Sequence, residues 1–252
     1  MPEEILYEKR GRIVVITINR PAALNALTPD SARALGEAWQ RFRDDAEAWV
    51  AVVTGAGERA FCAGYETSPE ALALAGAKAS VATIPTHFGI TKPVIAAVNG
   101  VCVAGGWWIA QECDLRVASE TARFGITQVK WGLMPAFTAT LSRHLLPGHA
   151  LELLLTGKLI TARRAYEMGF VNEVTPPGQA LQRTLEVAEA ICENGPIAVR
   201  MSKELFYKGQ SLSEAAAFEL TWQRYAENEA TRDAKEGIRA FMEKRKPKFT
   251  NA

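Results

Sequence analysis

The sequence has 252 residues, of which 48% are hydrophobic, and a formal net charge of +1. A chain of this length and composition can bury one large core, and its near-neutral charge argues against a nucleic-acid or anionic-membrane partner. No window approaches about 20 consecutive apolar residues, so we expect no membrane-spanning helix. The chain begins MPEEILYEKRGR, without the apolar stretch of a signal peptide, and we expect a cytoplasmic protein.

The first half of the chain alternates predicted strands with predicted helices. Thr28 can cap a helix that has Pro29 at its first position and runs to about residue 46. Gly105 and Gly106 open a second helix, which reaches about Gln111. Strands are predicted where apolar, mostly β-branched residues run together, at 12–19, 50–55, 93–100 and 113–119. The alternation indicates an α/β fold.

After about residue 138 the pattern is mainly helical. The predicted helices are 138–146, 148–156, 161–168, 177–193, 196–208, 211–230 and 231–245, with one short strand at 170–175. From Pro196 onwards the helices are more polar. The Gly195-Pro196 pair is the candidate boundary between an α/β core, residues 1–195, and a C-terminal helical region, residues 196–252.

The four cysteines are typical of small core residues. They stand at positions 62, 102, 113 and 192, in apolar surroundings and without a CxxC spacing. This pattern indicates a reducing compartment rather than a disulfide framework or a metal centre. We therefore predict no metal site.

Two glycine-containing loops are candidates for chemistry. In the first, 58–70, a tight turn at residues 63–65 follows a strand. In the second, 99–114, Gly105 starts a helix, whose first N–H groups lack helical partners and lie at the positive end of the helix dipole. Such a start can stabilise an anionic oxygen, and an N–H from the 63–65 turn would complete a two-donor oxyanion hole. Both loops are also compatible with ordinary turns.

In its motifs the sequence resembles the crotonase (enoyl-CoA hydratase/isomerase) superfamily. The matching pieces are NRPAALNAL (19–27), AFCAG (60–64), KPVIAAVNG (92–100), AGG (104–106), CDLRVASETARFG (113–125) and EGIRAFMEKRKPKF (236–249). They follow the order and spacing of that family over nearly the whole chain. The resemblance implies a spiral of ββα units with a C-terminal helical trimerisation region, assembled as a homotrimer or a dimer of trimers.

The resemblance also implies an acyl-CoA thioester as ligand, with no cofactor beyond the coenzyme A that the substrate carries. The family polarises the thioester carbonyl with two backbone N–H groups, which fall here on Tyr65 and Gly105. The pantetheine and adenine sites would be lined by Ala23, Leu24, Ala63 and neighbouring backbone. Phe241 and Lys244 match positions at which the tail of a neighbouring subunit closes over the coenzyme A. This match favours a binding role for the basic run 244–248 over a solvated helix end.

The sequence departs from the family at the usual acid–base positions. In the hydratases two glutamates activate a water. The first stands three residues after the oxyanion glycine, where this sequence has Trp108, and the second stands where this sequence has Gln128. The carboxylate that isomerase- and dehalogenase-like members carry after the loop proline is replaced by Ala136. General acid–base groups each contribute about 10²–10⁴-fold, so we expect ordinary hydration to be slow by several orders of magnitude.

Other polar groups are candidates for the missing role. Glu66, near the expected mouth of the pocket, is interpreted either as a catalytic acid or base or as a loop-capping residue. Glu112, one helical turn after Trp108, is either a buried carboxylate with a raised pKa or a partner of Arg116 or nearby backbone. The amide of Gln128 can orient a water or a polar acyl group. The three histidines are scattered and are interpreted as structural.

Three functions remain open at this point. The favoured one is an enzyme of the hydratase/isomerase family that acts on an acyl-CoA thioester with relocated acid–base groups. The second is a reaction that needs only enolate stabilisation, such as decarboxylation of a malonyl-type CoA thioester, or thioester hydrolysis. The third is acyl-CoA binding without catalysis. Tyr65, Trp108 and Trp131 predict an aromatic-walled acyl pocket.

Overall fold

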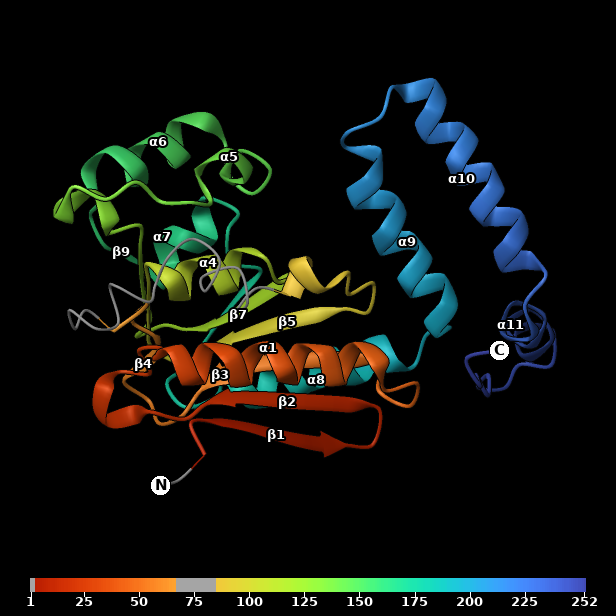
Figure 1. Ribbon diagram of the computed structural model, residues 1–252. Coiled ribbons are helices and arrows are strands. Elements are labelled where there is room, and N and C mark those ends of the chain that lie inside the picture. Colours follow the sequence, from red (N-terminus) through yellow and green to blue (C-terminus); the bar gives the residue numbers. More distant parts are fainter. Residues whose placement is uncertain (1–2, 67–84) are drawn as a thin grey trace.

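The computed structural model describes residues 3–66 and 85–252. A six-stranded sheet forms the centre of the molecule (Figure 1). The strand order is β1-β2-β3-β5-β7-β10. These strands are β1 (Ile5–Arg10), β2 (Ile13–Ile18), β3 (Val50–Gly55), β5 (Val94–Val98), β7 (Leu115–Ser119) and β10 (Glu173–Thr175). Apart from the antiparallel β1–β2 pair, all neighbours are parallel.

The central strands β3 and β5 are almost entirely apolar, as expected where both faces of a sheet are covered. Every residue of β3 and β5 is buried. Successive side chains of a strand point to opposite faces, and in β3 Ala51 and Val53 belong to one core cluster while Val50 and Val52 belong to another. The predicted strands at 50–55, 93–100 and 113–119 therefore agree with the structure. The edge strand β1 was not predicted, because its sequence ILYEKR is mostly polar and mostly exposed.

A second, smaller sheet connects the central strands to the loops. Its order is β4-β6-β8-β9, with β4 (Ala60–Cys62), β6 (Val101–Val103), β8 (Arg123–Gly125) and β9 (Ile160–Thr161). Each of β3, β5 and β7 continues directly into one of these short strands. This repeated pairing of a long strand with a short one agrees with the predicted α/β fold. Strands of two or three residues are too short to show a periodicity, and they were missed in the sequence.

The helices of the core lie on both sides of the large sheet (Figure 1). They are α1 (Pro29–Asp44), α4 (Gly105–Gln111), α5 (Thr138–Leu141), α6 (Pro147–Thr156), α7 (Ala162–Glu167) and α8 (Ala180–Cys192). Thr28 caps α1 as predicted, since its side chain accepts a hydrogen bond from Ser31 N at 3.0 Å. The helix predicted for 138–146 is shorter than expected, because α5 ends at Leu141 and continues as turns.

Three more helices follow and stand beside the α/β core (Figure 1). They are α9 (Pro196–Gly209), α10 (Glu214–Glu229) and α11 (Arg232–Met242). The end of the chain returns from them to the core, where Phe249 packs against a buried cluster and its carbonyl accepts from Arg12 at 3.2 Å. Among the helices of the described residues, none is both long and apolar enough to cross a lipid bilayer.

Candidate active site

The start of α4 is packed directly against β4. A Cβ atom added at Gly106 would lie 2.0 Å from the carbonyl oxygen of Cys62 and 2.8 Å from its carbonyl carbon. Because the obstacle is backbone, no side-chain rotation could relieve the contact. Gly106 therefore fixes the distance between the helix and the strand, and with it the position of the neighbouring Gly105.

The 63–65 turn lies against the same helix start. Gly64 has a φ of +98°, and a Cβ atom added there would lie 3.2 Å from Gly105 N and 2.9 Å from the Cβ of Ala104. The turn is held from the other side, where Leu27 N donates to Gly64 O at 2.8 Å and Glu66 N donates to Leu27 O at 2.9 Å. Since N–H groups alternate along an extended strand, the N–H of Tyr65 points away from Leu27. The two predicted loops thus meet at Gly64 and Gly105.

The loop at 19–27 adjoins this turn. Ala63 N donates to the carbonyl of Leu24 at 3.1 Å, and both Leu24 and Ala23 are half-buried. Glu66 is paired with Arg20 at 3.5 Å, and Arg20 is also paired with Glu4 at 3.0 Å. The carboxylate of Glu66 thus has a cationic partner in the structure. Residues 67–70 of the predicted loop lie outside the described residues.

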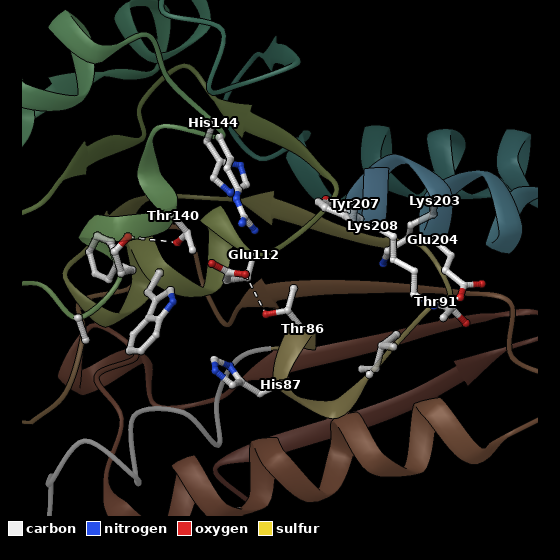
Figure 2. A pocket seen from close by; sticks show the side chains of 16 residues that line it. Thr86, His87, Thr91, Glu112, Thr140, His144, Lys203, Glu204, Tyr207 and Lys208 are labelled. Carbon is white, nitrogen blue, oxygen red and sulfur yellow. Dashed lines mark hydrogen bonds and ion pairs between the residues drawn. The ribbon is translucent and has the colours of Figure 1, made fainter. Parts of the chain in front are cut away.

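A cavity of about 690 Å³ opens beside α4 (Figure 2). Trp108 lines it and is 9% exposed, with ring centroids 5.5 Å from Phe137 and 6.4 Å from His87. Ala136 also lines it. The structure therefore brings together two of the residues predicted for the acyl site, and it adds His87, which was interpreted as structural from the sequence.

Trp131 does not belong to this wall. It ends the short helix η3 (Gln128–Trp131), and it is 78% exposed at the surface of the chain. The prediction that Trp131 helps to form an aromatic-walled pocket is wrong for the single chain. The reason is that η3 and the following Gly132 turn carry the side chain outward.

Gln128 begins η3 with its amide directed inward. Its Oε1 atom is buried and has no hydrogen-bond partner within the described residues. A buried amide oxygen without a partner costs about 1–3 kcal/mol. Such an atom is suited to accept a hydrogen bond from a water or a ligand.

Glu112 lines the same cavity, one turn beyond Trp108. Its carboxylate accepts hydrogen bonds from Thr86 Oγ1 at 2.8 Å and from Gln111 Nε2 at 3.3 Å. The expected partner Arg116 instead donates to backbone carbonyls, among them that of Cys113 at 2.6 Å. The suggestion that Glu112 pairs with Arg116 is therefore wrong, because the guanidinium is turned towards the interior.

His144 lines the cavity opposite Thr86 (Figure 2). Burial, together with the positive charges of Arg116 and Arg143, lowers the pKa of His144 to about 4. The imidazole is therefore neutral at physiological pH. Both His144 and Thr86 were missed in the sequence, because neither lies in a motif and only the fold brings them to one cavity.

Helix α9 supplies the remaining wall of the cavity. Lys203 forms an ion pair with Asp114, with Nζ and Oδ2 2.7 Å apart, and Tyr207 donates to Oδ1 of the same carboxylate at 3.0 Å. These contacts fix α9 against the loop that leads into β7. In contrast, α11, which carries Phe241 near its end, lies away from α4 (Figure 1), and the Phe241 side chain is 85% exposed. Lys244 follows two residues after the end of α11.

Comparison with known proteins identifies the family. The family model for enoyl-CoA hydratase/isomerase matches residues 8–252. The chain belongs to the enoyl-CoA hydratase/isomerase family. It is 40% identical to the enoyl-CoA hydratase EchA19 of Mycobacterium tuberculosis, with 98% of this chain and 97% of that protein covered. It is 37% identical to a short-chain-enoyl-CoA hydratase of Clostridium acetobutylicum, with 96% and 95% covered.

A solved structure of an enoyl-CoA hydratase from Bacillus anthracis has the same fold. Its TM-score is 0.94 at 32% identity, with 99% of this chain and 100% of that chain covered. The resemblance seen in the motifs is therefore confirmed, and the protein is a crotonase-type enzyme. Among the described residues, no group of three or more His, Cys, Asp and Glu side chains could hold a metal ion.

Proposed function

We propose that this member of the enoyl-CoA hydratase/isomerase family acts on an acyl-CoA thioester, whose carbonyl oxygen accepts hydrogen bonds from Tyr65 N and Gly105 N. The observation that carries the proposal is the approach of the Gly64 turn to the start of α4, where an added Cβ would lie 3.2 Å from Gly105 N. A backbone donor at a helix start, together with a second one from the adjacent turn, is suited to an oxygen on which negative charge develops. The relatives named above support the ligand class, since both are enoyl-CoA hydratases.

The thioester would lie between the two loops and the cavity. Ala23, Leu24 and Ala63 would contact the coenzyme A part, while Trp108 and Ala136 would contact the acyl part. We further propose that the protein is a homotrimer or a dimer of trimers, in which Phe241 and Lys244 of a neighbouring subunit close over the coenzyme A. The exposed aromatic residues of α10 and α11 support an assembly, because large apolar side chains such as Trp222, 65% exposed, are typical of contact surfaces.

The reaction itself would proceed without the glutamate pair of the hydratases. Trp108 stands where the hydratases have one of their glutamates, and its indole is packed against Phe137 and His87. The unpartnered Oε1 of Gln128 would accept a hydrogen bond from a water or a polar acyl group. Glu66 would act as the acid or base only after its ion pair with Arg20 is broken. These features favour weak hydration and support, as a second candidate, a reaction that needs only a stabilised enolate.

Replacement of Gly105 tests the proposed oxyanion hole. Gly105→Pro removes the N–H, and Gly105→Ala is the matched control that adds a side chain but keeps it. The alanine Cβ would lie 3.1 Å from the ring of Tyr65 and 3.3 Å from the Cα of Gly64, so the alanine variant reports the effect of this crowding by itself. Removing one such donor costs about 10²–10³-fold in kcat, so Gly105→Pro should lose that much relative to Gly105→Ala on the best thioester substrate.

The substrate is to be found first with a panel of enoyl-, saturated acyl- and malonyl-type CoA thioesters, followed by mass spectrometry of the products. Circular dichroism checks that the proline variant folds, because the residue before a proline avoids backbone angles such as those of Ala104, φ 52° and ψ −115°. A folded Gly105→Pro protein with the activity of Gly105→Ala would show that the hole lies elsewhere. Binding without turnover of any thioester would instead support a non-catalytic protein.

A further inference from the structure

The carboxylate of Glu112 has an open side towards the cavity. Figure 2 shows it in the middle of the pocket, between Thr86 and His87 on one side and Thr140 and His144 on the other. The hydrogen bonds from Thr86 and Gln111 use one acceptor site on each of its two oxygens. A carboxylate offers about four such sites, so Glu112 can accept further hydrogen bonds from a ligand.

The position of Glu112 on α4 determines which part of a ligand it can reach. Gly105, Trp108 and Glu112 are spaced i, i+3 and i+7 and share one face of the helix. Glu112 is about 10.5 Å along the axis from Gly105, at about 1.5 Å per residue. Its side chain leans back towards the helix start by about one residue position, which leaves the carboxylate roughly 9 Å along the axis from the level of Gly105. An acyl group bound at Gly105 N would thus meet Glu112 with its distal end.

The wall beside Glu112 is suited to a ring. The ring of Trp108 packs against those of Phe137 and His87 along this wall, and aromatic faces and edges favour other rings as partners. A cavity of about 690 Å³ also exceeds the needs of a short straight chain. These two features together favour a bulky, ring-bearing acyl group.

The charges around the cavity favour a neutral polar group at the end of that ring. Glu112 would repel a carboxylate, and Arg143, which lines the cavity beside His144, would repel a cation. The other charged groups of the wall are already paired, Lys203 with Asp114 and Lys208 with Glu204. A hydroxyl group can donate to the carboxylate without adding a charge.

We propose that Glu112 is a specificity residue, which accepts a hydrogen bond from a hydroxyl group at the distal end of a ring-bearing acyl group. This inference rests on the proposed function, because it takes the thioester carbonyl to lie at Gly105. A hydrogen bond to a carboxylate that lines a cavity is worth about tenfold or more in affinity. The acyl-CoA panel should therefore show a preference that one side chain controls.

Binding of saturated thioesters measures this preference without turnover. Isothermal titration calorimetry compares 3-phenylpropanoyl-CoA with its 3-hydroxyphenyl and 4-hydroxyphenyl analogues. The better hydroxylated probe should bind at least about tenfold more tightly than the phenyl probe. In Glu112→Gln, which keeps the shape and a neutral acceptor, the ratio should fall below about threefold, while affinity for the phenyl probe changes little. Glu167→Gln is the control, because Glu167 is an exposed residue of α7 paired with Arg163.

The outcomes separate this inference from the proposed function. If the wild-type protein binds the phenyl and hydroxyphenyl probes equally, Glu112 does not have the proposed role, whatever the variant does. A preference that persists in Glu112→Gln would assign the contact to another group and would also refute the inference. If neither the probes nor free coenzyme A bind, the proposed acyl-CoA function itself is contradicted.

Discussion

Gly106→Ala should damage both stability and activity, although it adds only one methyl group. The added carbon would lie 2.0 Å from the oxygen, 2.8 Å from the carbonyl carbon and 2.9 Å from the Cβ of Cys62. All three atoms belong to, or are attached directly to, the buried strand β4. The contact can be relieved only if α4 moves away from β4.

The size of the effect follows from two opposing contributions. Overpacking a core costs about 1–3 kcal/mol and occasionally more, and three contacts below 3.0 Å place this site at the upper end. Alanine recovers up to about 1 kcal/mol as a better helix former than glycine. We therefore expect the free energy of unfolding to fall by about 2 kcal/mol or more, which for a chain of this size lowers Tm by about 4–8 °C. Displacement of Gly105 should also reduce kcat by about 10²–10³-fold, as for a lost oxyanion donor.

Thermal unfolding at one fixed protein concentration, together with turnover of the best thioester, tests this expectation. Gly148→Ala in α6 is the matched control, because no atom lies within 4 Å of a Cβ added there. The control should leave activity unchanged and should not lower the free energy of unfolding, since alanine restricts the unfolded chain more than glycine does. A Gly106→Ala protein as stable and active as the control would refute the packing of α4 against β4 on which the proposed site depends.

Three further predictions concern pH, hydration and assembly. Folding lowers the pKa of His144 from 6.5 to about 4, so between pH 6.5 and pH 4 the unfolded chain binds more protons than the folded one. The free energy of unfolding should therefore be unaffected by His144 above pH 6.5 and should fall by up to about 3 kcal/mol towards pH 4. Urea titrations should show that the free energy of unfolding of His144→Gln falls less over this pH range than that of the wild type. The wild-type protein should hydrate crotonyl-CoA at a rate well below about 10 per second, and Gln128→Glu should raise this rate only when combined with Trp108→Glu. The rates of all three proteins are measured by the loss of enoyl absorbance. Fast turnover by the wild-type protein would contradict the reasoning. Sedimentation should show a trimer or hexamer, and Trp222→Glu should weaken it; a stable wild-type monomer at micromolar concentration would argue against the assembly.

Much of the fold could be predicted from the sequence because it follows from local patterns. The continuous apolar runs of β3 and β5 predict strands buried on both faces, and Thr28 before Pro29 predicts the start of α1. The glycines at 105 and 106 predict the start of α4. In each case a few neighbouring residues carry the signal, since backbone preference and burial act over one element at a time.

The cavity, in contrast, was decided only by the tertiary structure. Thr86 precedes β5, Glu112 ends α4 and Lys203 lies on α9, and no local pattern relates these three positions. The sequence suggested Arg116 or nearby backbone as the partner of Glu112, but α4 ends between Glu112 and Arg116, and the guanidinium donates to backbone carbonyls instead. Likewise, both Trp108 and Trp131 were predicted to line the acyl pocket, but Trp108 is buried and Trp131 is exposed. Their burial differs because it depends on which distant elements pack against them, and a single sequence read locally does not contain that information.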